Sequence, residues 1–230
     1  ARARDWIETV DPETGRPAGR DANAMPQWAG SCWYFLRFCD PGDTSAPLSR
    51  EAERYWMPVD LYVGGAEHAV MHLLYARFWA KVMADAGMIP FREPFPKLRS
   101  QGVMHARDPR TGEVTRMSKS KGNVVTPDSV AETHGADALR IYLLFMAPFE
   151  NNTIWEEEGI AGAKRFLQRI WRLANQVIAG QPAGLPTTKL TTSLHQTIRR
   201  VTADVEAFKF NTAIAALMEL LNVMSAHHHE

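Results

Sequence analysis

The stretch RMSKSKGN at residues 116–123 combines cations, hydroxyl groups and a glycine within eight positions. The side chains that can contact a polyphosphate there are those of Arg116, Ser118, Lys119, Ser120 and Lys121. Gly122 lets the loop move, so the loop can close as the phosphates shift. Such closure matters because contacts equal in the ground and transition states do not raise the chemical rate. The pattern predicts a phosphate-binding loop, and the alternative is a solvated basic turn.

The stretch GGAEHAVMH begins where an expected strand, VDLYV, ends. Gly64 and Gly65 allow a nucleotide to approach the backbone closely at that edge, and the Glu67 carboxylate can accept hydrogen bonds from ribose hydroxyls. We therefore expect this turn to border a nucleoside.

His68 and His72 are four residues apart and should share one face of a helix. Two histidines at this spacing could bind zinc, but no third ligand is evident nearby, and the order Glu-His-x-x-x-His differs from the zincin pattern. A pair of core histidines is the other interpretation. No bound metal is expected.

The run WAGSCWYF is rich in aromatic residues. Trp28, Ser31 and Tyr34 could supply the walls and the hydrogen-bonding groups of a small apolar pocket. A run of this kind is also compatible with plain hydrophobic core.

Composition narrows the class of protein. The chain has 230 residues, 45% of them hydrophobic, and a formal net charge of zero, so it can bury a core and any anion binding must come from local patches. Cys32 and Cys39 form no CxxC pair, which argues against a disulfide framework or a zinc ribbon and favours the cytoplasm. No long apolar run or signal-peptide pattern indicates a membrane.

The first half alternates strand and helix patterns. Residues 59–65 and 96–105 are expected strands, and the helical pattern of 67–87 lies between them and ends at a glycine. This order predicts a parallel sheet with a right-handed crossover. Residues 11–20 predict an exposed hairpin tip or linker, and 28–38 a strand end that runs into a helix.

The second half is expected to be helical after the lysine loop. The helical patterns cover 126–135, 136–148, a segment from 159, 190–207 and 210–226. The segment from 159 has an apolar stripe at Leu167, Ile170, Trp171, Ala174, Val177 and Ile178. Arg165, Arg169 and Arg172 form a basic face on the same segment, which can contact an RNA backbone or be an ordinary solvated face.

Together these blocks resemble the class I aminoacyl-tRNA synthetases, and the leucyl-tRNA synthetase family in particular. RMSKS is a variant of the Lys-Met-Ser-Lys-Ser signature, and MPQWAGSCWYFLRF and YWMPVDLYVGGAEHAVMHLLYARF are similar to that family. The resemblance continues through KGNVVTPDSVAETHGADALRIYLLFMAP and WEEEGIAGAKRFLQRIWRL, and it covers most of residues 20–178. It implies an α/β fold, with the second half of a Rossmann-like parallel sheet followed by an α-helical bundle.

The resemblance also implies ATP-dependent activation of leucine, with Mg²⁺ accompanying ATP, and transfer of leucine to tRNA(Leu). It assigns the phosphate contacts to Lys119, Arg116, Ser118 and Lys121. The adenosine would be bordered by Gly64, Gly65, Glu67, Gln101, Gly102, Val103 and Met104. The leucine end would be lined by Trp28, Ser31, Tyr34, His68 and His72. Arginine at position 116, in place of the first lysine of the signature, keeps the charge with a different geometry.

Two parts of the family pattern are missing from the sequence: the His-Ile-Gly-His signature with the first strand of the fold, and the editing domain. We therefore divide the chain into a carboxyl-side half of the catalytic domain (1–125), a connecting helical segment (126–150) and the start of an anticodon-binding bundle (151–230). The chain is expected to be an excised fragment, or one subunit of a split enzyme whose amino-terminal half is a partner.

Without that half we expect little or no leucine activation, because stabilisation of charge at the α-phosphate is lost. A different class of hypothesis is a non-catalytic module that binds RNA or a partner protein. The presence of Lys119, Glu67, His68 and His72 argues against it, since a pure interaction module needs no mobile phosphate loop.

Overall fold

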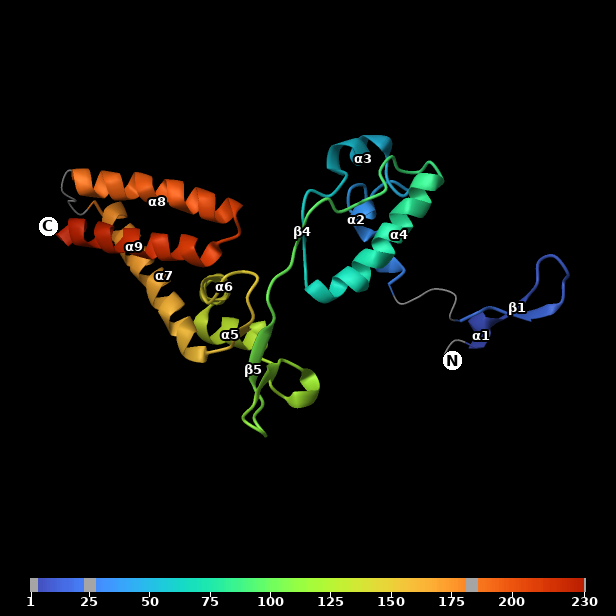
Figure 1. Ribbon diagram of the computed structural model, residues 1–230, viewed down its shortest axis with the longest axis horizontal. Helices are drawn as coiled ribbons and strands as arrows, with labels where there is room; N and C mark the ends of the chain where they lie inside the picture. Colours follow the sequence, from blue (N-terminus) through green and yellow to red (C-terminus); the bar gives the residue numbers. More distant parts are fainter. Residues whose placement is uncertain (1–3, 23–27, 181–185, 230) are drawn as a thin grey trace. The chain divides into compact units, whose positions relative to one another are not determined.

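The computed structural model describes residues 4–22, 28–180 and 186–229 (Figure 1). The chain forms two compact units, Ala1–Arg99 and Ser100–Glu230. This boundary reflects packing, and the functional division at residues 125 and 150 stays a prediction.

The first unit begins with α1 (Arg4–Ile7) and the hairpin of β1 (Glu8–Val10) and β2 (Pro17–Gly19), which pair antiparallel. The hairpin tip predicted within residues 11–20 is confirmed. The strand end predicted at 28–38 was wrong, because this segment forms the 3-10 turn η1 (Gly30–Cys32) and helix α2 (Tyr34–Arg37). Its aromatic rings pack around a later helix instead of joining a sheet: Tyr34, for example, stacks on His72.

The β–α–β order of the first unit is confirmed. The elements are α3 (Arg50–Trp56), β3 (Tyr62–Val63), η2 (Ala66–Val70), α4 (His72–Asp85) and β4 (Leu98–Arg99). β3 and β4 pair parallel, with Tyr62 opposite Leu98. Gly87, at φ +70°, follows the end of α4, as the sequence predicted.

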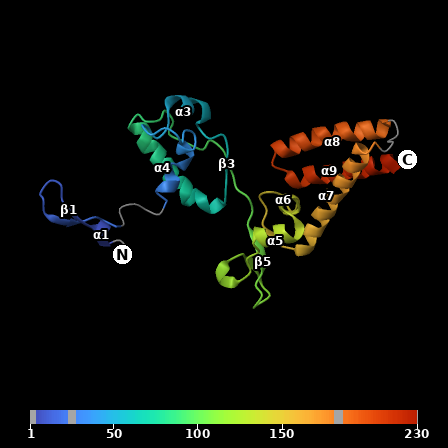
Figure 2. The same ribbon diagram turned by 180° about the vertical axis from the view of Figure 1, so that it is seen from behind.

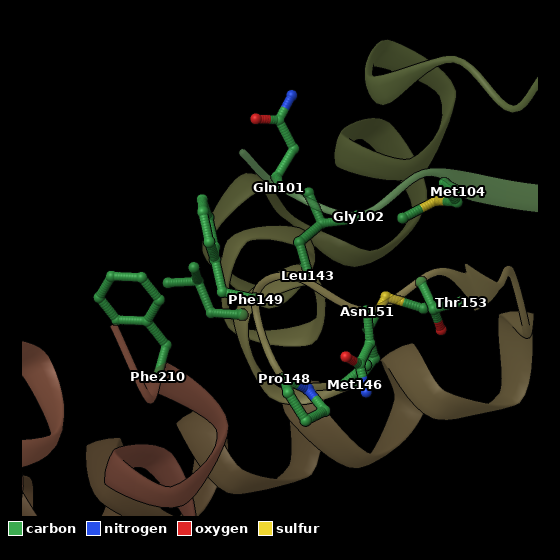
Figure 3. A pocket seen from close by; sticks show the side chains of 12 residues that line it. Gln101, Gly102, Met104, Leu143, Met146, Pro148, Phe149, Asn151, Thr153 and Phe210 are labelled. Carbon is green, nitrogen blue, oxygen red and sulfur yellow. The ribbon is translucent and has the colours of Figure 1, made fainter. Parts of the chain in front are cut away.

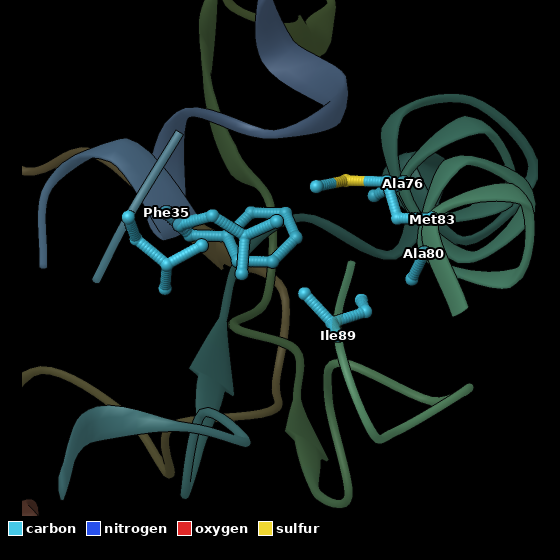
Figure 4. Packing of buried hydrophobic residues seen from close by; sticks show 7 residues of the cluster. Phe35, Ala76, Ala80, Met83 and Ile89 are labelled. Atoms are coloured by element: carbon cyan, nitrogen blue, oxygen red, sulfur yellow. The ribbon is translucent and has the colours of Figure 1, made fainter. Parts of the chain in front are cut away.

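Helix α4 carries the core of this unit. Figure 4 shows Ala76, Ala80 and Met83 of α4 turned toward Phe35 and Ile89, and all five are buried. The small alanines let the α2 segment approach the helix closely. The helix is also tied to the segment before β4 by an exposed ion-pair cluster. Hydrogen bonds from Arg77, which contribute most, and from Lys81 lower the pKa of Glu93 to about 2.

The second unit begins with a three-stranded sheet in the order β6-β5-β7. Its strands are β5 (Met104–Arg107), β6 (Val114–Arg116), antiparallel to β5, and β7 (Thr153–Ile154), parallel to β5. The single strand expected over 96–105 was wrong, because β4 and β5 divide it between two sheets. The division falls at Gly102, whose N–H donates to the Phe149 carbonyl and whose Cα lies against the backbone of Asn151, where a Cβ would collide.

Helices α5 (Pro127–His134) and α6 (Ala136–Phe145) follow where helices were expected. Pro127 opens α5, and Gly135, at φ +93°, separates the two helices. Thr126 stands at the N-cap position of α5, but its hydroxyl donates to the Ser129 hydroxyl and caps no backbone N–H.

The last helices are α7 (Glu157–Ile178), α8 (Thr188–Glu206) and α9 (Phe210–His229). Figures 1 and 2 show α8 and α9 side by side from both directions. The fold class predicted from the sequence, α/β followed by a helical bundle, is confirmed.

The predicted apolar stripe of α7 was only partly right. The residues that α7 buries are Ile160, Ala163, Phe166 and Leu173. Their spacing turns the inner face of the helix away from Trp171, which is 73% exposed. Most of the predicted stripe lines an apolar groove between α7 and α9 that remains open to solvent.

Candidate functional site

His72 is buried at the first position of α4. Its Nε2 lies 2.6 Å from the Ser31 carbonyl oxygen, which can only accept, so Nε2 carries the hydrogen. In the neutral ring, Nδ1 then accepts a hydrogen bond from the Tyr62 hydroxyl at 2.9 Å. Burial raises the pKa of Tyr62, which keeps this hydroxyl protonated. The two bonds hold the ring in one tautomer between η1 and β3.

Aromatic rings surround this histidine. Tyr34 stacks on His72 with ring centroids 5.7 Å apart, and Trp28 meets His68 edge-on at 6.0 Å. The structure thus brings together the residues expected at the leucine end, which are Trp28, Ser31, Tyr34, His68 and His72. Nδ1 of His68 is buried, and it has no hydrogen-bond partner among the described residues. A polar group of a ligand would find its partner at this atom.

The glycine turn follows directly after β3. The Gly64 N–H donates to the Arg99 carbonyl at 3.1 Å, which continues the pairing with β4. A Cβ at Gly64 would lie 2.8 Å from the Tyr62 ring, and one at Gly65 would collide with the Glu67 carboxylate. Glu67 is therefore folded back against the turn. Packing against the Tyr62 ring thus favours glycine at position 64, whereas at position 65 the flexible end of the Glu67 side chain could shift to admit a Cβ.

The lysine loop lies in the second unit. It leaves β6 at Arg116, forms the 3-10 turn η3 (Lys119–Lys121) and ends at Gly122, whose φ of +68° favours glycine. Lys119 is exposed and Lys121 half-buried. Neither lysine forms an ion pair with a carboxylate in the described part of the chain. Both charges are therefore available to an anionic ligand. The Ser118 and Ser120 hydroxyls are 2.9 Å apart on the same turn.

The turn of the β5–β6 hairpin supports this loop. Arg110 Nη2 donates to the Ser120 carbonyl at 3.3 Å. Asp108 is buried and accepts the Arg110 backbone N–H at 2.8 Å. This bond is the main reason that the pKa of Asp108 is lowered, and the charges of Arg110 and Lys121 lower it further. An ionised Asp108 thus lies within the electrostatic field of the loop.

The residues expected beside adenine lie at the start of β5. Figure 3 shows Gln101, Gly102 and Met104 at an apolar cavity of about 230 Å³. Its other walls are Leu143, Leu144, Met146, Ala147, Pro148, Phe149, Asn151, Thr153 and Phe210. The N–H groups of Gly102 and Val103 donate to the Phe149 carbonyl and to Asn152 Oδ1. Protein groups therefore occupy this backbone edge, and its contact with adenine stays a prediction.

The arginines of α7 are not equivalent. Arg169 and Arg172 line a polar cavity of about 230 Å³ together with Leu173, Gln176 and Ser225, whereas Arg165 is exposed elsewhere on the helix. Arg169 Nη2 also donates to Asn222 Oδ1 of α9 at 2.7 Å. Two of the three predicted cations thus lie at one polar surface.

Within the described ranges, no three side chains of His, Cys, Asp or Glu gather closely enough to hold a metal ion. The absence of protein-bound zinc stays a prediction. None of the helices in the described ranges has the length and apolar character needed to span a membrane.

The chain matches the family model of the tRNA synthetases class I (I, L, M and V) over residues 32–156, more than half of its length. The chain therefore belongs to this family of class I synthetases. Within the family it is similar to leucyl-tRNA synthetases. It is 49% identical to the leucine--tRNA ligase 1 of Rhizobium johnstonii, across 98% of this chain and 30% of that relative.

Solved structures agree with this similarity. The crystal structure of the ternary complex of an Agrobacterium radiobacter LeuRS with tRNA and LeuAMS matches with a TM-score of 0.82 and 35% identity, over 98% of this chain and 30% of that chain. A Mycobacterium tuberculosis methionyl-tRNA synthetase bound by methionyl-adenylate matches over 96% of this chain and 48% of that chain, with a TM-score of 0.63. Its identity of 20% indicates a shared fold alone. The chain spans about a third of the length of the leucine enzymes that it matches.

The sequence did not indicate two residues of these sites. Tyr62 was read as part of a strand, and only the structure places its hydroxyl on His72. Asn123 was read as the end of the lysine loop, yet it is buried and hydrogen-bonded to it. A polar side chain between Gly122 and the apolar Val124 was the one available signal for Asn123.

Proposed function

We propose that the chain takes part in ATP-dependent activation of leucine and in its transfer to tRNA(Leu), as part of a leucyl-tRNA synthetase active site. The observation that carries this proposal is the lysine loop, where neither Lys119 nor Lys121 forms an ion pair with a carboxylate in the described part of the chain. Lys119 is the main cation for the ATP phosphates, assisted by Arg116, Ser118 and Lys121. Mg²⁺ enters with ATP, held by its phosphates, and no protein-bound zinc takes part.

The first unit supplies the leucine end. The rings around His72 form an apolar lining, and the buried Nδ1 of His68 offers one polar partner within it. Such a lining selects by shape and separates near-isosteric amino acids by about 1–3 kcal/mol. The adenosine side comprises Gly64, Gly65, Glu67, Gln101, Val103 and Met104.

The activity of the 230-residue chain alone is proposed to be low, because the sequence lacks the His-Ile-Gly-His signature. The test mixes this chain with the complementary amino-terminal part of a leucyl-tRNA synthetase and measures leucine-dependent pyrophosphate exchange. Exchange should appear in the mixture and be nearly absent from the chain alone. Normal turnover by the chain alone would contradict this part of the proposal.

Lys119→Ala should lower kcat in the mixture by about 100-fold to 1000-fold, because it removes a cation aimed at developing phosphate charge. Lys189→Ala, which removes an exposed lysine on α8, is the matched control and should leave the rate unchanged. Equal rates for the two variants would count against the phosphate role of the loop.

A second candidate is a non-catalytic module that binds RNA. The polar cavity at Arg169 and Arg172 favours RNA contact, which would weaken as salt rises because counterions are released on binding. A chain with this role alone would bind tRNA(Leu) in a salt-dependent manner and give no exchange with any complement. In the first proposal the same arginines contact tRNA beside Arg165.

A further inference from the structure

Asn123 is the buried polar residue closest in sequence to the lysine turn, with 6% of its surface exposed. Its Oδ1 accepts the Ser118 backbone N–H at 2.8 Å. Its Nδ2 lies 3.3 Å from Thr115 Oγ1 and 3.4 Å from the carbonyl oxygens of Ala106 and Arg116. The short bond therefore reaches the loop, and the longer ones reach the β5–β6 hairpin.

These contacts close the loop on itself. Ser118 precedes η3 and Asn123 follows it, so the bond from Ser118 to Asn123 joins the two ends of the segment that carries Lys119 and Lys121. Gly122 turns the backbone back toward Ser118 in its left-handed conformation. The ends of the turn are thereby held on the sheet, while Lys119 within the turn is exposed and Lys121 is half-buried.

We propose that Asn123 is the positioning residue of the lysine loop, which fixes both ends of the turn so that only Lys119–Lys121 rearranges over the phosphates. This inference rests on the proposed phosphate role of the loop. A carboxamide suits the task because its oxygen accepts from the Ser118 N–H, while the two hydrogens of its NH2 group are shared among the three oxygens that surround it. A carboxylate of the same shape could keep the first bond but would face those three oxygens without a hydrogen to donate.

The first test uses the 230-residue chain alone and follows hydrogen exchange of the Ser118 amide by NMR. Asn123→Ala should speed this exchange, while the amides of α7, remote from the loop in sequence, keep their protection. Asn175→Ala is the matched control, since the Asn175 side chain also donates to a backbone carbonyl, at Trp171. Unchanged Ser118 exchange in Asn123→Ala would overturn the inference.

The second test uses the mixture with the amino-terminal complement and separates kcat from the KM for ATP. Asn123→Ala should misplace the ends of the loop and lower kcat by about tenfold to 100-fold with a smaller change in KM, because the loop contacts strengthen in the transition state. Asn123→Asp should restore less than half of the lost rate, since it keeps one of the two sets of bonds. A rate that falls only in proportion to the folded fraction, measured by circular dichroism, would show a merely structural role and overturn the inference.

Should Asn123→Ala fail to fold, Thr115→Val tests the same anchor by removing one acceptor of Nδ2. Thr115→Val should raise the hydrogen-exchange rate of the Ser118 amide and lower kcat, each by a smaller factor than Asn123→Ala is expected to. If neither quantity changes, the inference is overturned. Lys119→Ala separates the two proposals. If Lys119→Ala loses pyrophosphate exchange while Asn123→Ala keeps a normal rate of pyrophosphate exchange, only the positioning role is rejected. A normal rate of pyrophosphate exchange in Lys119→Ala rejects the proposed function.

Discussion

At the scale of single residues, His72 shows how one buried side chain joins segments that are distant in sequence. Its two ring nitrogens bond to Ser31 on one side and to Tyr62 on the other. A buried polar atom that loses its partner keeps the full cost of leaving water, whereas an intact network specifies one arrangement. The position of His72 in the proposed leucine pocket thus depends on Tyr62, a residue of a short strand.

Tyr62→Phe should lower the free energy of unfolding by about 1–3 kcal/mol, because Nδ1 of His72 loses its hydrogen bond while it stays buried. Tyr34→Phe is the control, since the Tyr34 hydroxyl has no hydrogen bond within the described ranges, and its effect should stay within about 0.5 kcal/mol. Urea unfolding followed by circular dichroism measures both. An equal loss in the two variants would mean that the hydroxyl of Tyr62 makes no specific contribution.

At the scale of elements, α7 contains two glycines, Gly159 and Gly162, that have opposite effects on its stability. A Cβ at Gly159 would lie 2.5 Å from the ring of Tyr142, which is buried and whose hydroxyl accepts the Glu156 N–H. A Cβ at Gly162 would meet nothing closer than the end of the Arg165 side chain at 3.8 Å. The first glycine lets α7 approach α6, and the second only weakens the helix.

Gly159→Ala should therefore destabilise the chain by about 1–3 kcal/mol, because overpacking against a fixed ring outweighs the gain in helix propensity. Gly162→Ala should stabilise it by about 0.5–1 kcal/mol, because alanine restricts the unfolded chain and fits the helix. Thermal unfolding of the two variants beside the unchanged chain gives the signs. Stabilisation by both changes would show that α6 and α7 are not in close contact at Tyr142.

At the scale of the whole molecule, the first unit exposes a continuous apolar row. Leu74, Phe78 and Val82 follow one another at intervals of four along α4 and are 55%, 64% and 43% exposed, and Val70 at the end of η2 is 75% exposed. The other face of α4 is already buried against Phe35 and Ile89. A helix that is apolar on both faces is typical of the interior of a larger structure. This agrees with the chain spanning 30% of its leucine-enzyme relative.

The chain on its own should accordingly self-associate, because large exposed apolar patches favour association. Phe78→Lys should weaken the association constant by more than about tenfold, since burial of one Phe side chain contributes about 1.5–3 kcal/mol. Met88→Lys, at an exposed site outside the row, is the control. Sedimentation velocity over a range of concentrations measures the difference, and an unchanged constant for Phe78→Lys would exclude this row as the contact.

Local signals in the sequence were sufficient for much of the fold. The helices after the lysine loop were predicted nearly to their ends, because apolar periodicity, Pro127 and Gly135 act within one or two turns. The strand expected over 96–105 was wrong, because its interruption at Gly102 depends on the backbone of Asn151, some fifty residues later. The pattern of residues in a short stretch of sequence cannot reveal a contact with a residue that far along the chain.

By itself, the sequence determined the family, the order of the elements and the residue types of the lysine loop, because these depend on identity and spacing along the chain. The tertiary structure alone decided which atoms hold those residues in place. Tyr62 and Asn123 gained their roles from hydrogen bonds to groups on other elements, whose geometry exists only after folding. A hydrogen bond requires two atoms to meet within about 3 Å, and folding is the step that brings distant residues that close.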